Sequence, residues 1–230
     1  LSRIAGFLRD ALQSRLFGTS VAMDAFVIAY RIPNYLRRIF AEGSMQMAFV
    51  PVLNELRERG DKVALKDFID HMAGALFALV FVVAGIGMLA APLLAELFAP
   101  GAVGTPGGDA KLALIAQMLQ ITFPYALFIS LASLVGGVLN SYQKFAIPAL
   151  SPILLNISMI AAALCLVPHM KAWGYEPVLA LAWGVFVAGV LQLAFQLPSL
   201  AKLGLLPRPR FDLAHAGVRK IMKLMVPTLF

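Results

Sequence analysis

Long apolar runs are the feature that most constrains the fold of this chain. Four of them, residues 68–94, 112–142, 148–167 and 178–200, carry few charged side chains. A helix needs about 20 apolar residues to cross the roughly 30 Å hydrocarbon core of a bilayer. With 60% hydrophobic residues, 13% charged residues and a mean hydropathy of +0.84, the chain lies far from the composition of a soluble domain. We therefore predict an all-α, multi-pass membrane helix bundle.

The first 43 residues differ from these runs because they combine apolar helices with many charges. We predict helices over residues 1–17 and 21–40, joined at a turn over residues 18–20. These two helices bring the expected number of spans to six, and a seventh helix is predicted to begin near Gly217. Their charged residues of interest are Arg3, Arg9, Asp10, Asp24, Arg31, Arg37 and Arg38. Since each charge inside a membrane costs roughly 2.5 to 3.5 kcal/mol on insertion scales, such a cluster indicates a functional path.

Helical spacing predicts how these charges are arranged. Asp24, Arg31 and Arg38 follow one another at intervals of seven residues, which places them in one stripe on the second helix, with Asn34 beside it. If the two helices run antiparallel, Arg9 lies between Asp24 and Arg31 in depth. We therefore expect a column of guanidinium groups that Asp10 and Asp24 hold in place, with Asp24 orienting Arg9 or Arg31.

Arginine in such a column favours a phosphate ligand, because the guanidinium fork binds phosphate oxygens in pairs. The alternative is that the arginines extend to the interface or pair with Asp10, Asp24 and Glu42, and so only hold the bundle together. This alternative applies most to Arg15 and to one of Arg37 and Arg38. The excess of arginine over carboxylate favours the functional interpretation, because an unpaired buried cation requires an anion.

Two prolines are predicted hinges. Pro33 removes a backbone hydrogen bond from the second helix just before Arg37, and Pro124 does the same in the fourth span.

Lysine and arginine in the loops predict the orientation in the membrane. The loops predicted on one side of the membrane carry, in chain order, four, one and six of these residues. The loops on the other side carry only Lys111 and Lys171. The richer side is predicted to be cytoplasmic. We interpret residues 1–204 as a six-helix lobe and residues 205–230 as a basic cytoplasmic linker with the start of the seventh helix. Because the chain begins and ends within apolar segments, we expect it to be part of a longer protein.

Other kinds of chemistry have little support in the sequence. The one cysteine, Cys165, and the scattered His71, His169 and His215 do not match a disulfide or metal site, and we predict no cofactor. Three dispersed carboxylates, Asp61, Asp67 and Asp70, do not form the cluster that a membrane enzyme would need. Asn140, Ser151 and Asn156 are interpreted as hydrogen-bonding groups between helices. We attribute the net charge of +7 to residues that set the orientation in the membrane and to residues that bind an anionic ligand. No nucleic-acid partner is expected.

Several stretches resemble a known family, and together they cover nearly the whole chain. They read SRIAGFLRDALQSRLFG, MDAF, IPNYLRRIFAEGSMQMAFVPVL, QITFPYALFISLASLVGGVLNSYQKFAIPALSPILLNISMI and PVLALAWGVFVAGVLQLAFQLP. They are similar to the MurJ (MviN) lipid II flippases of the MOP exporter superfamily. The resemblance implies the N-terminal lobe of a MATE-like fold with two lobes around a cationic cavity, in the bacterial inner membrane. The important family positions fall on Arg3, Arg9, Asp10, Asp24 and Arg37, with Ser2, Pro33, Asn34 and Arg38 in the same motifs.

By this resemblance the expected activity is the movement of lipid II, an undecaprenyl-pyrophosphate-linked precursor, across the membrane by alternating access, without bond chemistry. Expected partners are lipid II, membrane lipids and cell-wall synthesis proteins. Three alternatives stay open. They are a related exporter of another polyprenyl-linked oligosaccharide or of drugs, a membrane enzyme that acts on polyprenyl phosphates, and a membrane scaffold that transports nothing.

Overall fold

The computed structural model describes residues 2–37, 44–212 and 217–219, and this part of the chain is helical without strands. Four helical segments are long and apolar enough to cross a membrane. They are α4 (Lys62–Leu89), α6 (Gly108–Ser141), the segment Ala146–Ala172, and α10 (Leu179–Lys202). The third of these consists of α7 (Ala146–Ala149), α8 (Ser151–Ala161), a π-helical stretch (Ala162–Leu166) and α9 (Val167–Ala172). The predicted all-α membrane bundle is confirmed.

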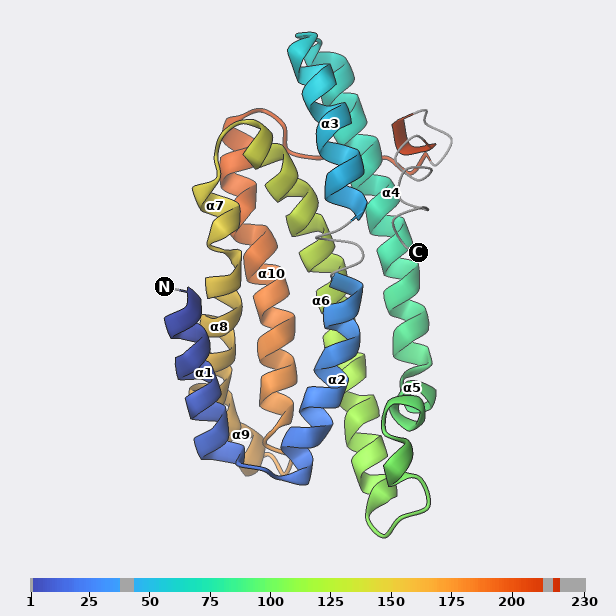
Figure 1. Ribbon diagram of the computed structural model, residues 1–230, viewed down its shortest axis with the longest axis vertical. Helices are drawn as coiled ribbons and strands as arrows, with labels where there is room; N and C mark the ends of the chain where they lie inside the picture. The colour runs from blue at the N-terminus through green and yellow to red at the C-terminus, as the bar shows by residue number, and fades with distance from the viewer. Residues whose placement is uncertain (1, 38–43, 213–216, 220–230) are drawn as a thin grey trace.

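The two charged helices are shorter than the others. Helix α1 (Ser2–Phe17) has 16 residues and α2 (Val21–Arg37) has 17, so each is about 25 Å long at 1.5 Å per residue. Gly18, with φ +56°, forms the turn between them, as expected. Helix α3 (Ser44–Glu58) follows, and Figure 1 shows it above α2. Within the described residues, four of the six expected spans thus meet the length requirement, and the expected seventh helix lies almost wholly outside these residues.

The third expected span is divided into two helices. Helix α4 ends at Leu89, and α5 (Ala91–Phe98) starts after Ala90 as a separate helix. Pro92 stands in the first turn of α5, and because proline has no backbone N–H it cannot continue the hydrogen-bond ladder of α4. The sequence-based range of 68–94 was therefore wrong at its C-terminal end, and α4 begins before its N-terminal end, at Lys62.

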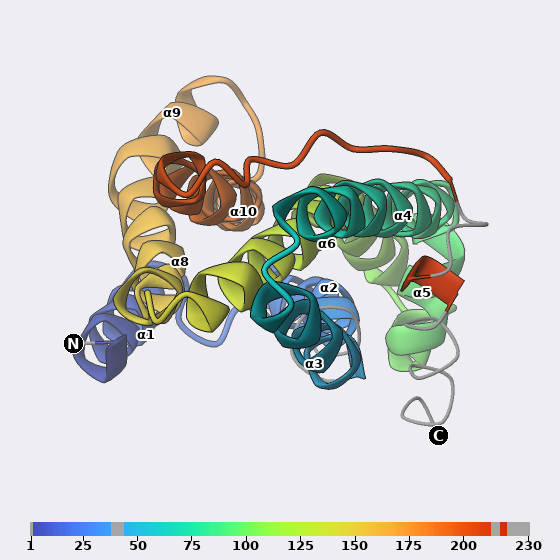
Figure 2. The same ribbon diagram turned by 90° about the horizontal axis from the view of Figure 1, so that it is seen from above.

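Helix α6 is the centre of the bundle, and α2, α4, α5 and α10 all pack against it. Figure 2 shows it between α4 on one side and α8 and α10 on the other. Glycines let α4 and α10 approach α6 closely. A Cβ on Gly87 of α4 would lie 2.2 Å from a ring carbon of Phe123, and one on Gly189 of α10 would lie 2.9 Å from the ring of Tyr125. Small residues at such crossings let helix backbones come together, as is common in membrane bundles.

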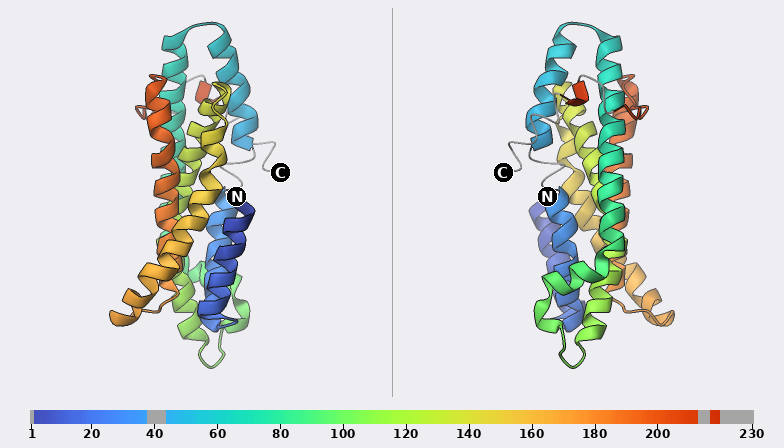
Figure 3. Two further views of the ribbon diagram at one scale, coloured as in Figure 1. Left: turned by 90° about the vertical axis from the view of Figure 1, so that its left-hand side faces the viewer. Right: turned by 90° about the vertical axis from the view of Figure 1, so that its right-hand side faces the viewer.

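The loops alternate between the two ends of the bundle (Figures 1 and 3). The α3–α4 loop, the α6–α7 turn and the end of α10 lie at one end. The Gly18 turn, the α5–α6 loop and the α9–α10 loop lie at the other. The basic loops therefore share one end, while Lys111 at the start of α6 and Lys171 in α9 lie at the opposite end. Which end faces the cytoplasm stays a prediction.

Candidate functional site

The helices that carry the predicted arginine column separate after the Gly18 turn. Helix α1 packs on α8, whereas α2 packs on α6. The two run in opposite directions, and Figures 1 and 2 show them apart, with α1 beside α8 and α2 beside α6. The expectation of a single column was thus wrong in one respect, because its charges are divided between two helix pairs.

Arg9 is the most firmly held of the predicted site residues. Its Nε and Nη2 atoms donate to Oδ1 of Asp10 at 2.9 and 2.7 Å, and its Nη1 donates to Oδ1 of Asn156 on α8 at 2.9 Å. The side chain of Arg9 is 24% exposed. A guanidinium has five N–H donors, so two remain available beyond these three bonds. The result is an oriented, partly buried cation that can still bind an anion.

Asn156 connects this cation to the rest of the lobe. Besides accepting from Arg9, it directs Nδ2 toward the backbone carbonyl of Ser2, 3.4 Å away, and its side chain is buried. One amide therefore contacts α1 at two points about two turns apart. The interpretation of Asn156 as an interhelical hydrogen-bonding residue agrees with this geometry, although its partner was not predicted.

The other predicted arginines are less constrained. Arg3 on α1 and Arg31 on α2 are exposed, and neither has a hydrogen bond or ion pair with the described part of the chain. Arg37 is the last residue of α2, and Arg38 lies outside the described residues. Asn34 is half-buried beside Pro33. Both Pro33 and Pro124 lie inside helices that continue past them, so their role as hinges stays a prediction.

Asp24 has a different partner from the one expected. Its Oδ2 lies 3.7 Å from Nζ of Lys111, in the first turns of α6, and the Asp24 side chain is 65% exposed. Among the described residues no ion pair links it to Arg9 or Arg31, so that expectation was wrong. The physical reason is that α2 packs on α6, which brings the start of one helix beside the start of the other. From the sequence, Lys111 had been interpreted only as one of the loop charges that indicate the orientation in the membrane.

A polar pocket of about 400 Å³ lies between α2, α6, α8 and α10, next to the Arg9 site. Two buried glutamines of α10, Gln192 and Gln196, line it together with Ser151 of α8. These glutamines were not predicted. The available signal was their spacing of four residues, which places two amides on one face of an otherwise apolar helix.

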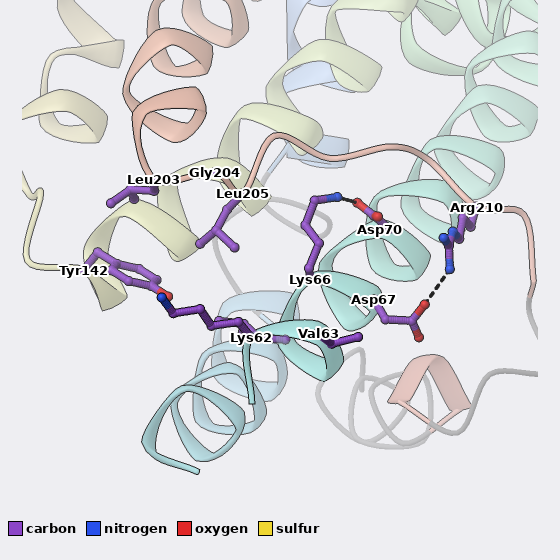
Figure 4. A pocket seen from close by; sticks show the side chains of 11 residues that line it. Lys62, Val63, Lys66, Asp67, Asp70, Tyr142, Leu203, Gly204, Leu205 and Arg210 are labelled. Atoms are coloured by element: carbon purple, nitrogen blue, oxygen red, sulfur yellow. Dashed lines mark hydrogen bonds and ion pairs between the residues drawn. The ribbon is translucent and has the colours of Figure 1, made fainter. Parts of the chain in front are cut away.

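The three dispersed carboxylates at the start of α4 have structural partners. Asp61 caps the helix by accepting from the backbone of Val63 and Ala64 at 3.1 and 2.9 Å. Asp67 accepts from the guanidinium of Arg210 at 2.6 Å, and the buried Asp70 pairs with Lys66 (Figure 4). These contacts assign the carboxylates to helix capping and to the attachment of the segment after α10.

That attachment places the segment after α10 across α4. The backbone N–H of Arg208 donates to Oδ1 of Asp70 at 2.7 Å, and that of Arg210 donates to the Asp70 carbonyl at 3.1 Å. Gly74 permits the approach, because a Cβ there would lie 2.1 Å from the backbone oxygen of Arg210. Figure 2 shows the segment crossing from α10 to α4.

The chain is similar to known proteins over nearly its whole length. The model of the family described as "Lipid II flippase MurJ" matches residues 13–230, which is most of the chain. The chain belongs to the MurJ family. A probable lipid II flippase MurJ of Haemophilus influenzae is 44% identical over all of this chain and 45% of its own length. The lipid II flippase MurJ of Burkholderia cenocepacia is 42% identical over all of this chain and 44% of its own length.

A solved MurJ structure has the same fold. A lipid II flippase MurJ in an inward closed conformation aligns with a TM-score of 0.79 and 27% identity, over 99% of this chain and 44% of that one. The chain thus spans less than half the length of these MurJ relatives. Membership in the MurJ family confirms the resemblance seen in the sequence, and it agrees with a chain that crosses a membrane.

Proposed function

We propose that the protein is a lipid II flippase of the bacterial inner membrane, and that this chain supplies one lobe of it. Its α1 and α2 helices would bind the pyrophosphate that joins the lipid to the sugars. The observation that carries the proposal is the Arg9 guanidinium, which Asp10 and Asn156 hold by three hydrogen bonds while two N–H donors remain available. An oriented fork of this kind is suited to phosphate oxygens.

The charge balance of the two helices supports the same function. Arg3 and Arg31 are not paired within the described residues, while the two carboxylates, Asp10 and Asp24, already contact Arg9 and Lys111. A pyrophosphate would offset the surplus positive charge, and arginines on both α1 and α2 would contact it from two sides. A scaffold without a ligand would be expected to balance these charges in pairs.

The separation of α1 from α2 also suits transport. In transporters built from repeated lobes, the substrate lies between helix bundles that rock relative to each other. In this protein α1 with α8 and α2 with α6 would form the two sides of a path, and a second lobe in the full-length protein would close it. Alternating access would then move the pyrophosphate between the leaflets without breaking a bond.

Growth of cells that depend on the full-length protein tests the proposal. Arg9→Ala should abolish growth while the protein still reaches the membrane, and Arg15→Ala, on the same helix, should grow normally. Purified Arg9→Ala protein should also lose affinity for undecaprenyl pyrophosphate. Normal growth with Arg9→Ala would refute the role of Arg9. Binding of an unrelated drug but not of this lipid would favour the alternative of a related exporter.

A further inference from the structure

The polar pocket beside the Arg9 site contains hydrogen-bonding groups that the fold does not satisfy. Gln192 and Gln196 of α10 are each only 2% exposed. Their Nε2 atoms are used, since Gln192 donates to the Ser151 carbonyl at 2.7 Å and Gln196 donates to Ser151 Oγ at 3.2 Å. The Oε1 atom of each glutamine has no partner within the described residues. Buried polar atoms are nearly always hydrogen-bonded, so two unpaired amide oxygens in one pocket point to a ligand that donates to them.

The other groups around the pocket specify the chemistry of that ligand. Besides the two glutamines, the polar side chains that line it are hydroxyls and amides, from Tyr30, Tyr125, Ser133, Asn140 and Ser151, and no charged side chain from the described ranges takes part. Pro148, Pro152 and Leu155 supply apolar surface. A neutral ring with several hydroxyl or amide groups and one apolar face matches this lining, which describes a sugar. The volume of about 400 Å³ is within the range of small-molecule pockets.

Position relative to Arg9 connects the pocket with the proposed substrate. Asn156, which holds Arg9, directly follows Leu155, which lines the pocket, and Ser151 lies on the same helix. Five residues of α-helix correspond to about 7.5 Å, so the two sites are neighbours along α8. In a polyprenyl-pyrophosphate-linked sugar, the first ring is bonded directly to the phosphate that Arg9 would contact.

We propose that this pocket binds the first sugar ring of the lipid-linked substrate, through the amide groups of Gln192 and Gln196. The inference rests on the proposed function, in which Arg9 binds the pyrophosphate. Arg9 would thus recognise the charge common to all polyprenyl pyrophosphates, and the pocket would distinguish those that carry a sugar. The glutamines would satisfy their unpaired oxygens with hydroxyl or N-acetyl N–H donors of the ring.

Binding to two lipids tests the pocket separately from Arg9. The probes are undecaprenyl pyrophosphate and the same lipid carrying one N-acetylated sugar, measured with full-length protein in nanodiscs. Gln196→Leu should lower affinity for the sugar-bearing lipid about tenfold or more, because a site built for hydroxyl groups loses much when the hydrogen bonds are lost. Affinity for the sugar-free lipid should not change. Gln120→Leu, the same substitution on the exposed face of α6, should affect neither lipid.

A second variant controls for misfolding of the first. Ser133→Leu would fill the pocket without removing the glutamine hydrogen bonds, and should also weaken only the sugar-bearing lipid. Equal loss for both lipids, or no loss with either pocket variant, would overturn the sugar site while leaving the role of Arg9 intact. If the unmodified protein binds neither lipid, the proposed function is wrong and this inference falls with it.

Discussion

Arg9 of α1 and Asn156 of α8 are joined by a 2.9 Å hydrogen bond between residues 147 positions apart in the chain. This bond fixes the position of the guanidinium relative to the transmembrane bundle, and Asp10 fixes its orientation. A cation held in this way needs little rearrangement to bind a phosphate. The contact therefore connects the packing of α1 on α8 with the proposed function.

Asn156→Leu is predicted to impair transport even though Arg9 is retained. Loss of the amide removes one acceptor from a charged donor, which costs about 1.5 to 3 kcal/mol, and frees the guanidinium to move. Asn156→Gln keeps a neutral amide oxygen that can accept this bond, and should retain more activity. Affinity for undecaprenyl pyrophosphate, measured for both variants, checks the prediction, and equal affinity for the two would argue against positioning by Asn156.

Asp24 and Lys111 are predicted to couple only weakly. Their charged atoms are 3.7 Å apart and the Asp24 side chain is 65% exposed, and exposed ion pairs contribute about 0 to 1 kcal/mol. A double-mutant cycle with Asp24→Asn and Lys111→Ala, followed by thermal unfolding, measures the coupling. If Asp24→Asn abolishes transport while Lys111→Ala does not, Asp24 has a role in the path beyond this pair. A large coupling energy would instead show that the ion pair stabilises the fold.

Gly74 is predicted to be essential for holding the segment after α10 on α4. Gly74→Leu would place side-chain atoms where the backbone of Arg210 lies, and should release the segment so that trypsin cuts faster after Arg210. Gly85→Leu, on the same helix, is the matched control because a Cβ at Gly85 would have no atom within 4 Å. Identical cleavage of the two variants would contradict the close approach at Gly74.

Residues at the two ends of the bundle are predicted to lie on opposite sides of the membrane. In a Cys165→Ser background, an impermeant thiol reagent should label Tyr175→Cys in intact cells but not Arg59→Cys. Both native side chains are exposed, and the loop glycines Gly60 and Gly174 are less suitable because their φ angles are positive. Labelling of Arg59→Cys alone would reverse the predicted orientation.

The helices were largely predictable because long apolar runs and the Gly18 turn are local features of the sequence. The break at Ala90 could have been predicted as well, since Pro92 is visible in the chain. The partners of the charged residues could not, because they depend on which helices are neighbours. Asp24 pairs with Lys111 only because α2 packs on α6, and Arg9 reaches Asn156 only because α1 packs on α8.

Charge in an apolar setting predicted the arginines of α1 and α2 as a candidate site, and this stays a prediction, whereas the neutral polar pocket was not predicted. Gln192 and Gln196 carry no charge, so they do not stand out in an apolar run. Their significance comes from burial without a partner for Oε1 among the described residues, which only the packed structure reveals. The same holds for Asp70, which looked isolated in the sequence and contacts the backbone of Arg208 in the fold.

The most direct test of the central claim is the fraction of lipid II exposed on the outer leaflet in cells that depend on the full-length protein. Arg9→Lys keeps the charge but loses the fork that contacts Asp10 and Asn156 and would contact phosphate, and Arg15→Lys makes the same change nearly two turns along the same helix. We predict that outer-leaflet lipid II falls strongly with Arg9→Lys and stays normal with Arg15→Lys. Normal exposure with Arg9→Lys would contradict an oriented guanidinium as the pyrophosphate ligand.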